Sequence, residues 1–101
     1  HEGRLEHMTY ILVRQKVEDY DKWKPVYDAD AARRKAGGSQ GTRVFRSASD
    51  PNEVLVLLTW TDLESARRFA EAPELRDAMQ RAGVVDKPDM YFLDEVDQTP
   101  A

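Results

Sequence analysis

The sequence contains no cysteine, and both of its histidines, His1 and His7, lie in its first seven residues. Residues 1–7 include a Glu-Gly-Arg run that resembles the end of a protease site, so we predict an expression-tag remnant at 1–7 and a single domain over 8–101. Without cysteine or histidine, this domain can have no disulfide, no zinc site with the usual nitrogen and sulfur ligands, and no haem held by a His or Cys. A Cys–His or Ser–His nucleophilic pair is excluded as well. We therefore expect no metal and no cofactor.

Long hydrophobic runs are also missing, and the formal net charge is −4. No apolar segment reaches the length of a membrane span and no secretory signal precedes Met8, so we predict a cytoplasmic protein with no membrane partner. Nucleic-acid binding needs a basic face. The one compact basic cluster, residues 33–35, falls at the expected end of a helix, where it suits the helix dipole. We therefore expect no nucleic-acid partner.

The pattern of apolar residues predicts four strands and three helical segments. Pro25 is awkward for the first helix unless it lies in the first turn or the helix kinks. The glycine-rich residues 37–41 are predicted to form a linker turn, and residues 49–52 a hairpin turn. Thr61 and Glu64 form a capping-box pattern. The strands are expected at 10–17, 42–47, 53–60 and 90–96, and the helices at about 20–36, from the cap at 61–64, and at 74–82.

The order β-α-β-β-α-β predicts an α+β, ferredoxin-like fold, an antiparallel four-stranded sheet with helices on one face. In the third strand, residues 54–58 are all apolar, so both faces of that strand need to be buried. Helices can cover only one face of such a sheet. The other face would be an exposed apolar patch unless a second copy covers it, which predicts a homodimer through the sheet face.

Several segments resemble the dimeric α/β-barrel superfamily, and within it the antibiotic biosynthesis monooxygenase-like group. They are the early Trp-Lys of the first helix, the VFRS and DPNEVLVLLTW hairpin, TDLESARRF, PELRDAM and YFLDEV. This resemblance covers nearly all of residues 8–96. It implies a pocket between sheet and helices, in which the group's monooxygenases oxidise aromatic polyketides without metal or flavin. The chain departs from the haem-degrading branch, because 8–101 has no histidine and 9–17 no asparagine.

Aromatic residues provide the first candidates for a site. Trp60 matches the position of a pocket tryptophan in the group and could stack on a flat ligand. Alternatively, it closes the end of the core with its indole N–H bonded to the backbone. Trp23 and Tyr27 lie about one turn apart on the inner face of the first helix and could line the same cavity, together with Phe69 of the second helix. Each of these three side chains could instead be ordinary core.

Charged and hydroxyl side chains provide the second set. Arg14 and Arg46 lie within strands, and an inward-facing arginine could stabilise an enolate or phenolate. Facing outward, each would meet solvent or pair with Asp94 or Glu95 across the dimer, and the strand register decides between the two. Tyr91 and Asp28 are acid–base candidates, with packing as the alternative for the tyrosine.

Three functions remain open from the residues. The first is a cofactor-independent monooxygenase acting on a small aromatic or polyketide-type substrate. The second is a polyketide-cyclase-like or small-ligand-binding protein. The third is a non-catalytic dimeric domain whose own side chains fill the pocket. A cavity between sheet and helices would favour the first two over the third.

Overall fold

The computed structural model describes residues 8–101; the predicted tag at 1–7 lies outside the described residues. The strands are β1 (Thr9–Lys16), β2 (Ser39–Arg46), β3 (Glu53–Trp60) and β4 (Asp89–Asp94). The helices are α1 (Tyr20–Ala29), α2 (Ala31–Gly37), α3 (Leu63–Glu71) and α4 (Pro73–Ala82).

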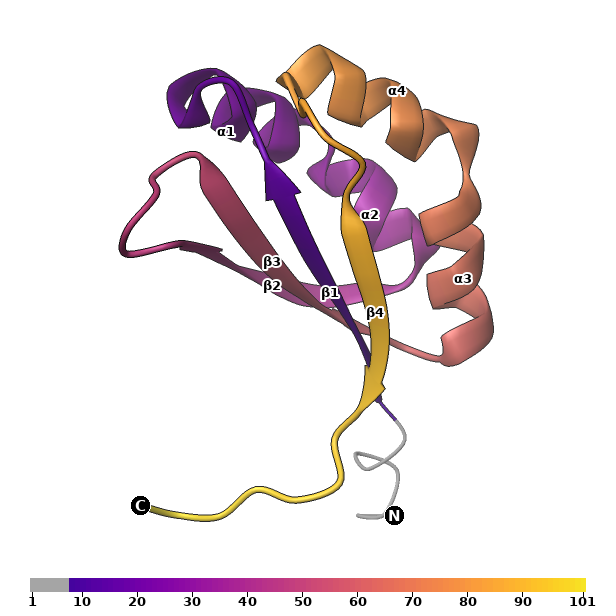
Figure 1. Cartoon of the computed structure of the whole chain (residues 1–101). Coiled ribbons are helices and arrows are strands. Elements are labelled where there is room, and N and C mark those ends of the chain that lie inside the picture. The colour runs from indigo at the N-terminus through magenta and orange to yellow at the C-terminus, as the bar shows by residue number, and fades with distance from the viewer. Residues whose placement is uncertain (1–7) are drawn as a thin grey trace.

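The four strands form one antiparallel sheet in the order β2-β3-β1-β4. Within residues 8–101, all four helices cover the same face of this sheet and no helix covers the other (Figure 1). The predicted ferredoxin-like α+β fold is therefore confirmed. None of the helices in the described part of the chain is long and apolar enough to cross a lipid bilayer.

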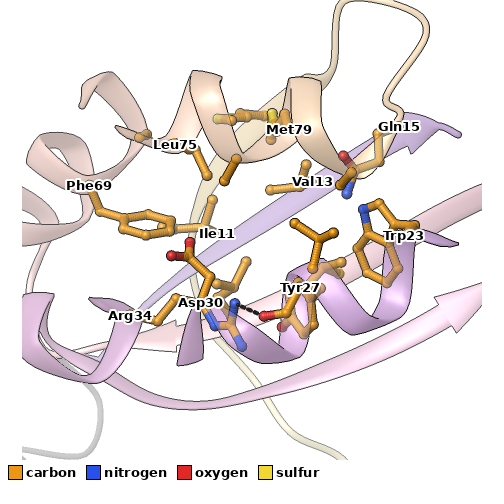
Figure 2. A pocket seen from close by; sticks show the side chains of 17 residues that line it. Ile11, Val13, Gln15, Trp23, Tyr27, Asp30, Arg34, Phe69, Leu75 and Met79 are labelled. Carbon is orange, nitrogen blue, oxygen red and sulfur yellow. Dashed lines mark hydrogen bonds between the residues drawn. The ribbon is translucent and has the colours of Figure 1, made fainter. Parts of the chain in front are cut away.

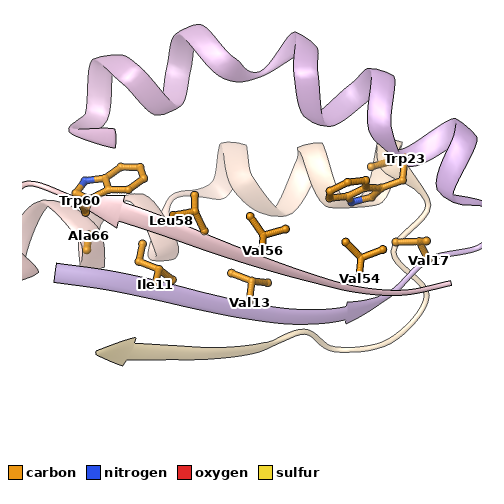
Figure 3. Packing of buried hydrophobic residues seen from close by; sticks show 10 residues of the cluster. Ile11, Val13, Val17, Trp23, Val54, Val56, Leu58, Trp60 and Ala66 are labelled. Atoms are coloured by element: carbon orange, nitrogen blue, oxygen red, sulfur yellow. The ribbon is translucent and has the colours of Figure 1, made fainter. Parts of the chain in front are cut away.

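The core lies between the sheet and the helices, and strand parity decides which residues enter it. In β3, Val54, Val56, Leu58 and Trp60 are buried, whereas the residues between them are only partly covered. The predicted inward parity of the first strand is also confirmed at Ile11, Val13 and Val17. Figure 3 shows Trp60 and Trp23 at opposite ends of this layer.

The single helix predicted over 20–36 is two helices separated at Asp30. Pro25 sits inside α1, and the chain changes direction five residues later. Asp30 N–H donates to the Tyr27 oxygen at 3.2 Å, and the Asp30 carboxylate accepts from Arg33. The predicted apolar stripe therefore stops at the break: Ala31 is exposed, and Arg34 takes the buried position.

Two local predictions were wrong in detail. The predicted linker turn at 37–41 is partly strand, because Ser39 pairs with Trp60 and β2 starts there through an irregularity between Ser39 and Gly41. The cap of α3 is Asp62, not the expected Thr61, since the Asp62 carboxylate accepts the Ser65 N–H at 2.7 Å. A charged acceptor makes the stronger cap bond.

The uncovered side of the sheet, named here the open sheet face, carries the other parity of each strand. The strand pairing places Leu12 opposite both Leu57 and Tyr91 on this face, and Phe45 opposite Leu55. Arg14 and Lys16 border the patch, and their charges are balanced within the chain by Glu53, Asp89 and Asp50. The face is therefore mainly apolar at its centre, with Arg14 and Lys16 compensated at its edge. Arg43 also lies on this face, opposite Leu57, with its guanidinium 5.3 Å from the Phe45 ring centroid.

Candidate functional site

A cavity of about 60 Å³ lies between the sheet and the helices. Figure 2 shows the side chains around it, which come from both layers of the fold. The lining is mostly apolar, with a few polar groups at the ends. It consists of Ile11, Val13, Gln15, Trp23, Val26, Tyr27, Asp30, Arg34, Val56, Leu58, Phe69, Ala70, Leu75, Ala78, Met79, Ala82 and Met90.

Three of the aromatic candidates meet at this cavity. Trp23 and Tyr27, one helical turn apart on α1, stack with ring centroids 4.8 Å apart and planes inclined by 19°. Phe69 of α3 lines the same space. The helical spacing of Trp23 and Tyr27, read from the sequence, is what directs both rings inward. These residues form a flat apolar wall suited to an aromatic ligand.

Two polar atoms at the cavity have no hydrogen-bond partner among the described residues: the Gln15 Oε1 and the Tyr27 hydroxyl. An unpartnered buried polar group costs about 1–3 kcal/mol, so a ligand that bonds to it would recover this energy. Gln15 was not among the sequence candidates. The signal for it was present, because Gln15 shares its parity with the buried Ile11 and Val13 of β1.

The end of the cavity away from Gln15 carries charge (Figure 2). Arg34 is 7% exposed, lies 3.8 Å above the Tyr27 ring centroid, and donates from Nη1 to the Tyr27 backbone oxygen at 2.8 Å. Asp30 also reaches this end, and Arg33 binds its carboxylate through Nε at 3.0 Å. Residues 33–35 were predicted to end the helix and to suit its dipole, so Arg34 was not among the site candidates. The signal for it was present, because Arg34 follows Tyr27 by seven residues and so falls on the same helix face.

A larger hollow of about 610 Å³ lies outside the cavity, beside α4 and the segment leading into β4. The two spaces share four lining residues: Ala70, Leu75, Met79 and Met90. These side chains form the partition between them. Methionine side chains are unbranched and change shape at low cost, so this partition can yield more easily than the rest of the wall.

The size of the cavity sets a condition on any ligand. An engineered cavity of about 150 Å³ accepts benzene, and sites for drug-sized ligands are about 300–1,000 Å³. At about 60 Å³, the cavity as it stands is too small for an aromatic ring. Binding of an aromatic ring therefore requires lining side chains to move, and Met79 and Met90, which border both spaces, are the most adaptable of them.

Trp60 is not part of the cavity lining. It is fully buried at the end of β3, and its indole N–H donates to the Gly37 oxygen at 3.0 Å. The Phe69 ring packs against it with centroids 4.5 Å apart. This geometry matches the alternative given above, in which the tryptophan closes the end of the core. Phe69, against which it packs, is itself a lining residue of the cavity.

The two strand arginines also lie away from the cavity. Arg14 is exposed on the open sheet face, where it pairs with Glu53 and, at 3.2 Å, with Asp89. Arg46 pairs with Val54 in the sheet and so lies on the helix side, but at an exposed edge, with its guanidinium 4.4 Å from the Tyr20 ring centroid. The described contacts thus bring neither arginine to the aromatic wall.

The acid–base candidates lie outside the cavity as well. Tyr91 is 51% exposed on the open sheet face. Asp28 is exposed on α1 and accepts from Lys24 Nζ at 2.8 Å. Residues 8–101 contain no group of three His, Cys, Asp or Glu side chains arranged to hold a metal ion.

Comparison with known proteins adds to this geometry. The family model for antibiotic biosynthesis monooxygenases matches residues 24–81, more than half of the chain. Among solved structures, the fold is similar to SnoaB from Streptomyces nogalater, a cofactor-independent oxygenase: the TM-score is 0.77 at 15% identity, covering 94% of this chain and 99% of SnoaB. A conserved protein from Methanosarcina mazei Go1 gives 0.76 at 9% identity, covering 95% of this chain and 100% of that one. No curated protein matches the chain in sequence.

Proposed function

Because the chain belongs to the antibiotic biosynthesis monooxygenase family, a branch of the dimeric α/β-barrel superfamily, we propose that its cavity binds a small aromatic substrate and supports monooxygenation without a cofactor. The observation that carries the proposal is one apolar cavity that joins the aromatic side chains Trp23, Tyr27 and Phe69 to two buried polar atoms without partners among residues 8–101. Such a combination of flat apolar walls and a few polar anchors is typical of small-molecule sites.

The reaction that fits this site uses the substrate as the source of electrons. A phenol bearing a ring C–H para to its hydroxyl loses a proton, and the resulting anion reduces O₂. One oxygen atom bonds to the ring carbon and becomes a quinone carbonyl. The other oxygen leaves as water with the two hydrogens lost from the substrate. Atoms and electrons balance with substrate and O₂ alone.

The chain's own contribution would be to bind, orient and exclude water. The stacked Trp23 and Tyr27 rings hold the substrate plane, and Gln15 Oε1 accepts a hydrogen bond from a substrate hydroxyl. A low-dielectric apolar wall strengthens each of these polar contacts. The absence of metal and cofactor, and the cytoplasmic location, stay predictions from the sequence.

The second part of the proposal is a homodimer through the open sheet face. Phe45 and Tyr91 are 45% and 51% exposed there, and the leucines beside them are only partly covered. A second copy would bury this apolar centre, and the ion pairs of Arg14 and Lys16 already compensate charge at its edge. The helices of residues 8–101 lie on the opposite face of the sheet and leave this one uncovered, which also supports a dimer (Figure 1).

Oxygen incorporation tests the reaction. Protein is mixed with a dihydroxynaphthalene under ¹⁸O₂, and oxygen uptake and product mass are followed. We expect one labelled atom in the quinone per O₂ consumed, with no added metal or flavin. Binding without oxygen uptake would favour the alternative of a cyclase-like or ligand-binding protein.

The place of binding is tested by the two tryptophans. The chain contains two tryptophans and so gives two indole N–H resonances, one from the cavity wall and one from outside it. The Trp23 resonance should shift on adding the dihydroxynaphthalene, while the Trp60 resonance moves much less; Trp60→Phe assigns them. A shift confined to Trp60, or no shift of either, would contradict a substrate site at this cavity.

A further inference from the structure

The charged groups around the cavity do not cancel. Of its lining residues, the only ionisable carboxylate is Asp30 and the only cation is Arg34. Asp30 is already neutralised by Arg33, which binds both of its oxygens. The positive charge of Arg34 is therefore left over at this end of an otherwise apolar space (Figure 2).

Arg34 has no counter-ion in the described part of the chain. None of the ion pairs formed there includes Arg34, although only 7% of its surface is exposed to solvent. A buried charge is strongly unfavourable unless an opposite charge or several hydrogen bonds compensate it. A ligand anion in the cavity would supply what the chain lacks.

A purely structural role does not use the whole guanidinium. Arg34 links α1 to α2 by stacking on Tyr27 and by donating one hydrogen bond to the Tyr27 oxygen. A guanidinium has several N–H donors in a planar fork, and this link engages only Nη1 and one face. Arg34 also borders a hollow on the outer side, lined in part by Ser39 and Thr42, but its small exposure leaves little room for water to solvate it.

The far end of the cavity has the opposite requirement. Gln15 lies beside Trp23, at the other end from Arg34 in Figure 2, and its Oε1 needs a hydrogen-bond donor. The Tyr27 hydroxyl, on the ring over which Arg34 lies, is likewise without a partner among residues 8–101. A matching ligand thus has an anionic group at one end, a flat ring in the middle and a hydroxyl at the other end.

From this arrangement we infer that the cavity selects aromatic monoanions carrying a hydroxyl opposite the anionic group, with Arg34 as the counter-ion. The inference rests on the proposed function, because it names the substrate class of the same cavity. It also explains how a phenol would be held as its reactive anion: a cation at the ring's edge favours the phenolate over the phenol. Arg34 is then a binding and specificity-determining residue of the site.

Matched ligands test the charge requirement. The probes are 4-hydroxybenzoate and 4-hydroxybenzamide, which have nearly the same shape but differ in charge, and affinity is measured by calorimetry. We expect the carboxylate to bind about tenfold more tightly than the amide, the effect of one charge-assisted bond. Benzoate, which lacks the hydroxyl, should bind about tenfold more weakly than 4-hydroxybenzoate, since Gln15 then stays unpartnered.

Variants assign the preference to one residue. Arg34→Gln should remove the discrimination between carboxylate and amide, and Arg34→Lys should retain most of it. Arg67→Gln is the control: Arg67 also lies over an aromatic ring, at 5.4 Å from that of Phe92, but is exposed and outside the cavity. It should bind both probes as the wild type does. Thermal melts of each variant show whether it is folded before binding is compared.

A further probe tests whether Arg34 binds a phenolate as well as a carboxylate. 4-Nitrophenol should bind with an absorbance shift toward its yellow anion in the wild type and in Arg34→Lys, but not in Arg34→Gln. If amide and carboxylate bind the wild type equally, the inference is overturned while the aromatic pocket stands. If no probe of either charge moves the Trp23 indole resonance, the inference and the proposed function fail together.

Discussion

Replacing each tryptophan with phenylalanine should separate core from cavity wall. Trp60 is fully buried and its indole N–H is bonded to the Gly37 oxygen, so Trp60→Phe removes a hydrogen bond and leaves a void at the end of β3. Trp23 borders a space that is already empty, so Trp23→Phe adds to an existing cavity and opens little new void. The two substitutions are chemically identical, which makes them a matched pair.

The expected magnitudes follow from these contacts. Gly37 is exposed, so water can replace the lost donor and the hydrogen bond contributes about 1 kcal/mol. The unfilled volume adds about 1–2 kcal/mol, giving about 2–3 kcal/mol for Trp60→Phe against about 1 kcal/mol for Trp23→Phe. In a domain of this size, about 2–3 kcal/mol lowers the melting temperature by roughly 10–20 °C.

Urea unfolding followed by circular dichroism measures the difference. All proteins are compared at one concentration, because the stability of a dimer depends on the concentration of its protomers. The slope of free energy against urea should be unchanged, so that midpoints report stability alone. Equal losses for the two variants, or a larger loss for Trp23→Phe, would refute the assignment of Trp60 to the core.

Three further outcomes are expected. Leu57→Lys, on the open sheet face, should convert a particle of twice the chain mass into a monomer or unfold it, whereas Leu63→Lys on the helix side should not; light scattering distinguishes them. Gly38→Ala should destabilise the fold strongly, as seen in its melting temperature, because φ is +125° and the added Cβ would lie 2.7 Å from an indole nitrogen. The backbone N–H of Ser65 lowers the pKa of Asp62, so its stabilisation is present above the ordinary carboxyl pKa and is lost as pH falls through the lowered one. The stability difference between wild type and Asp62→Asn should therefore be present at neutral pH and should shrink as pH falls through this range, so that their urea midpoints converge in acid.

Strand parity made most of the fold predictable from sequence. Apolar alternation in β1 and the unbroken apolar run of β3 are local signals, and they defined the core face and the need for a covered second face. Trp23 and Tyr27 were found by helical spacing for the same reason. Such patterns depend only on neighbours a few residues away along the chain.

The rest of the site depends on contacts that no local pattern contains. Arg34 follows Tyr27 by seven residues, a spacing that places both on one helix face, but periodicity does not reveal whether a charged side chain at such a position is buried or reaches solvent. The side on which Arg46 lies required the β2–β3 register. Trp60 could not be assigned, because a large aromatic residue at the end of a strand looks the same in sequence whether it closes a core or lines a pocket.

The two-sided apolar character of β3 has a consequence for folding fidelity. A strand with one polar face cannot slide by one residue without burying polar groups, but residues 54–58 would lose little hydrophobic burial in such a slip. Discrimination against the misaligned sheet must then come from the ends of the strand. At one end, the turn closes with Glu53 N–H on the Asp50 oxygen at 3.0 Å; at the other, the Trp60 indole meets the Gly37 oxygen. These two hydrogen bonds, one at each end of a strand whose middle tolerates a slip, favour a single register.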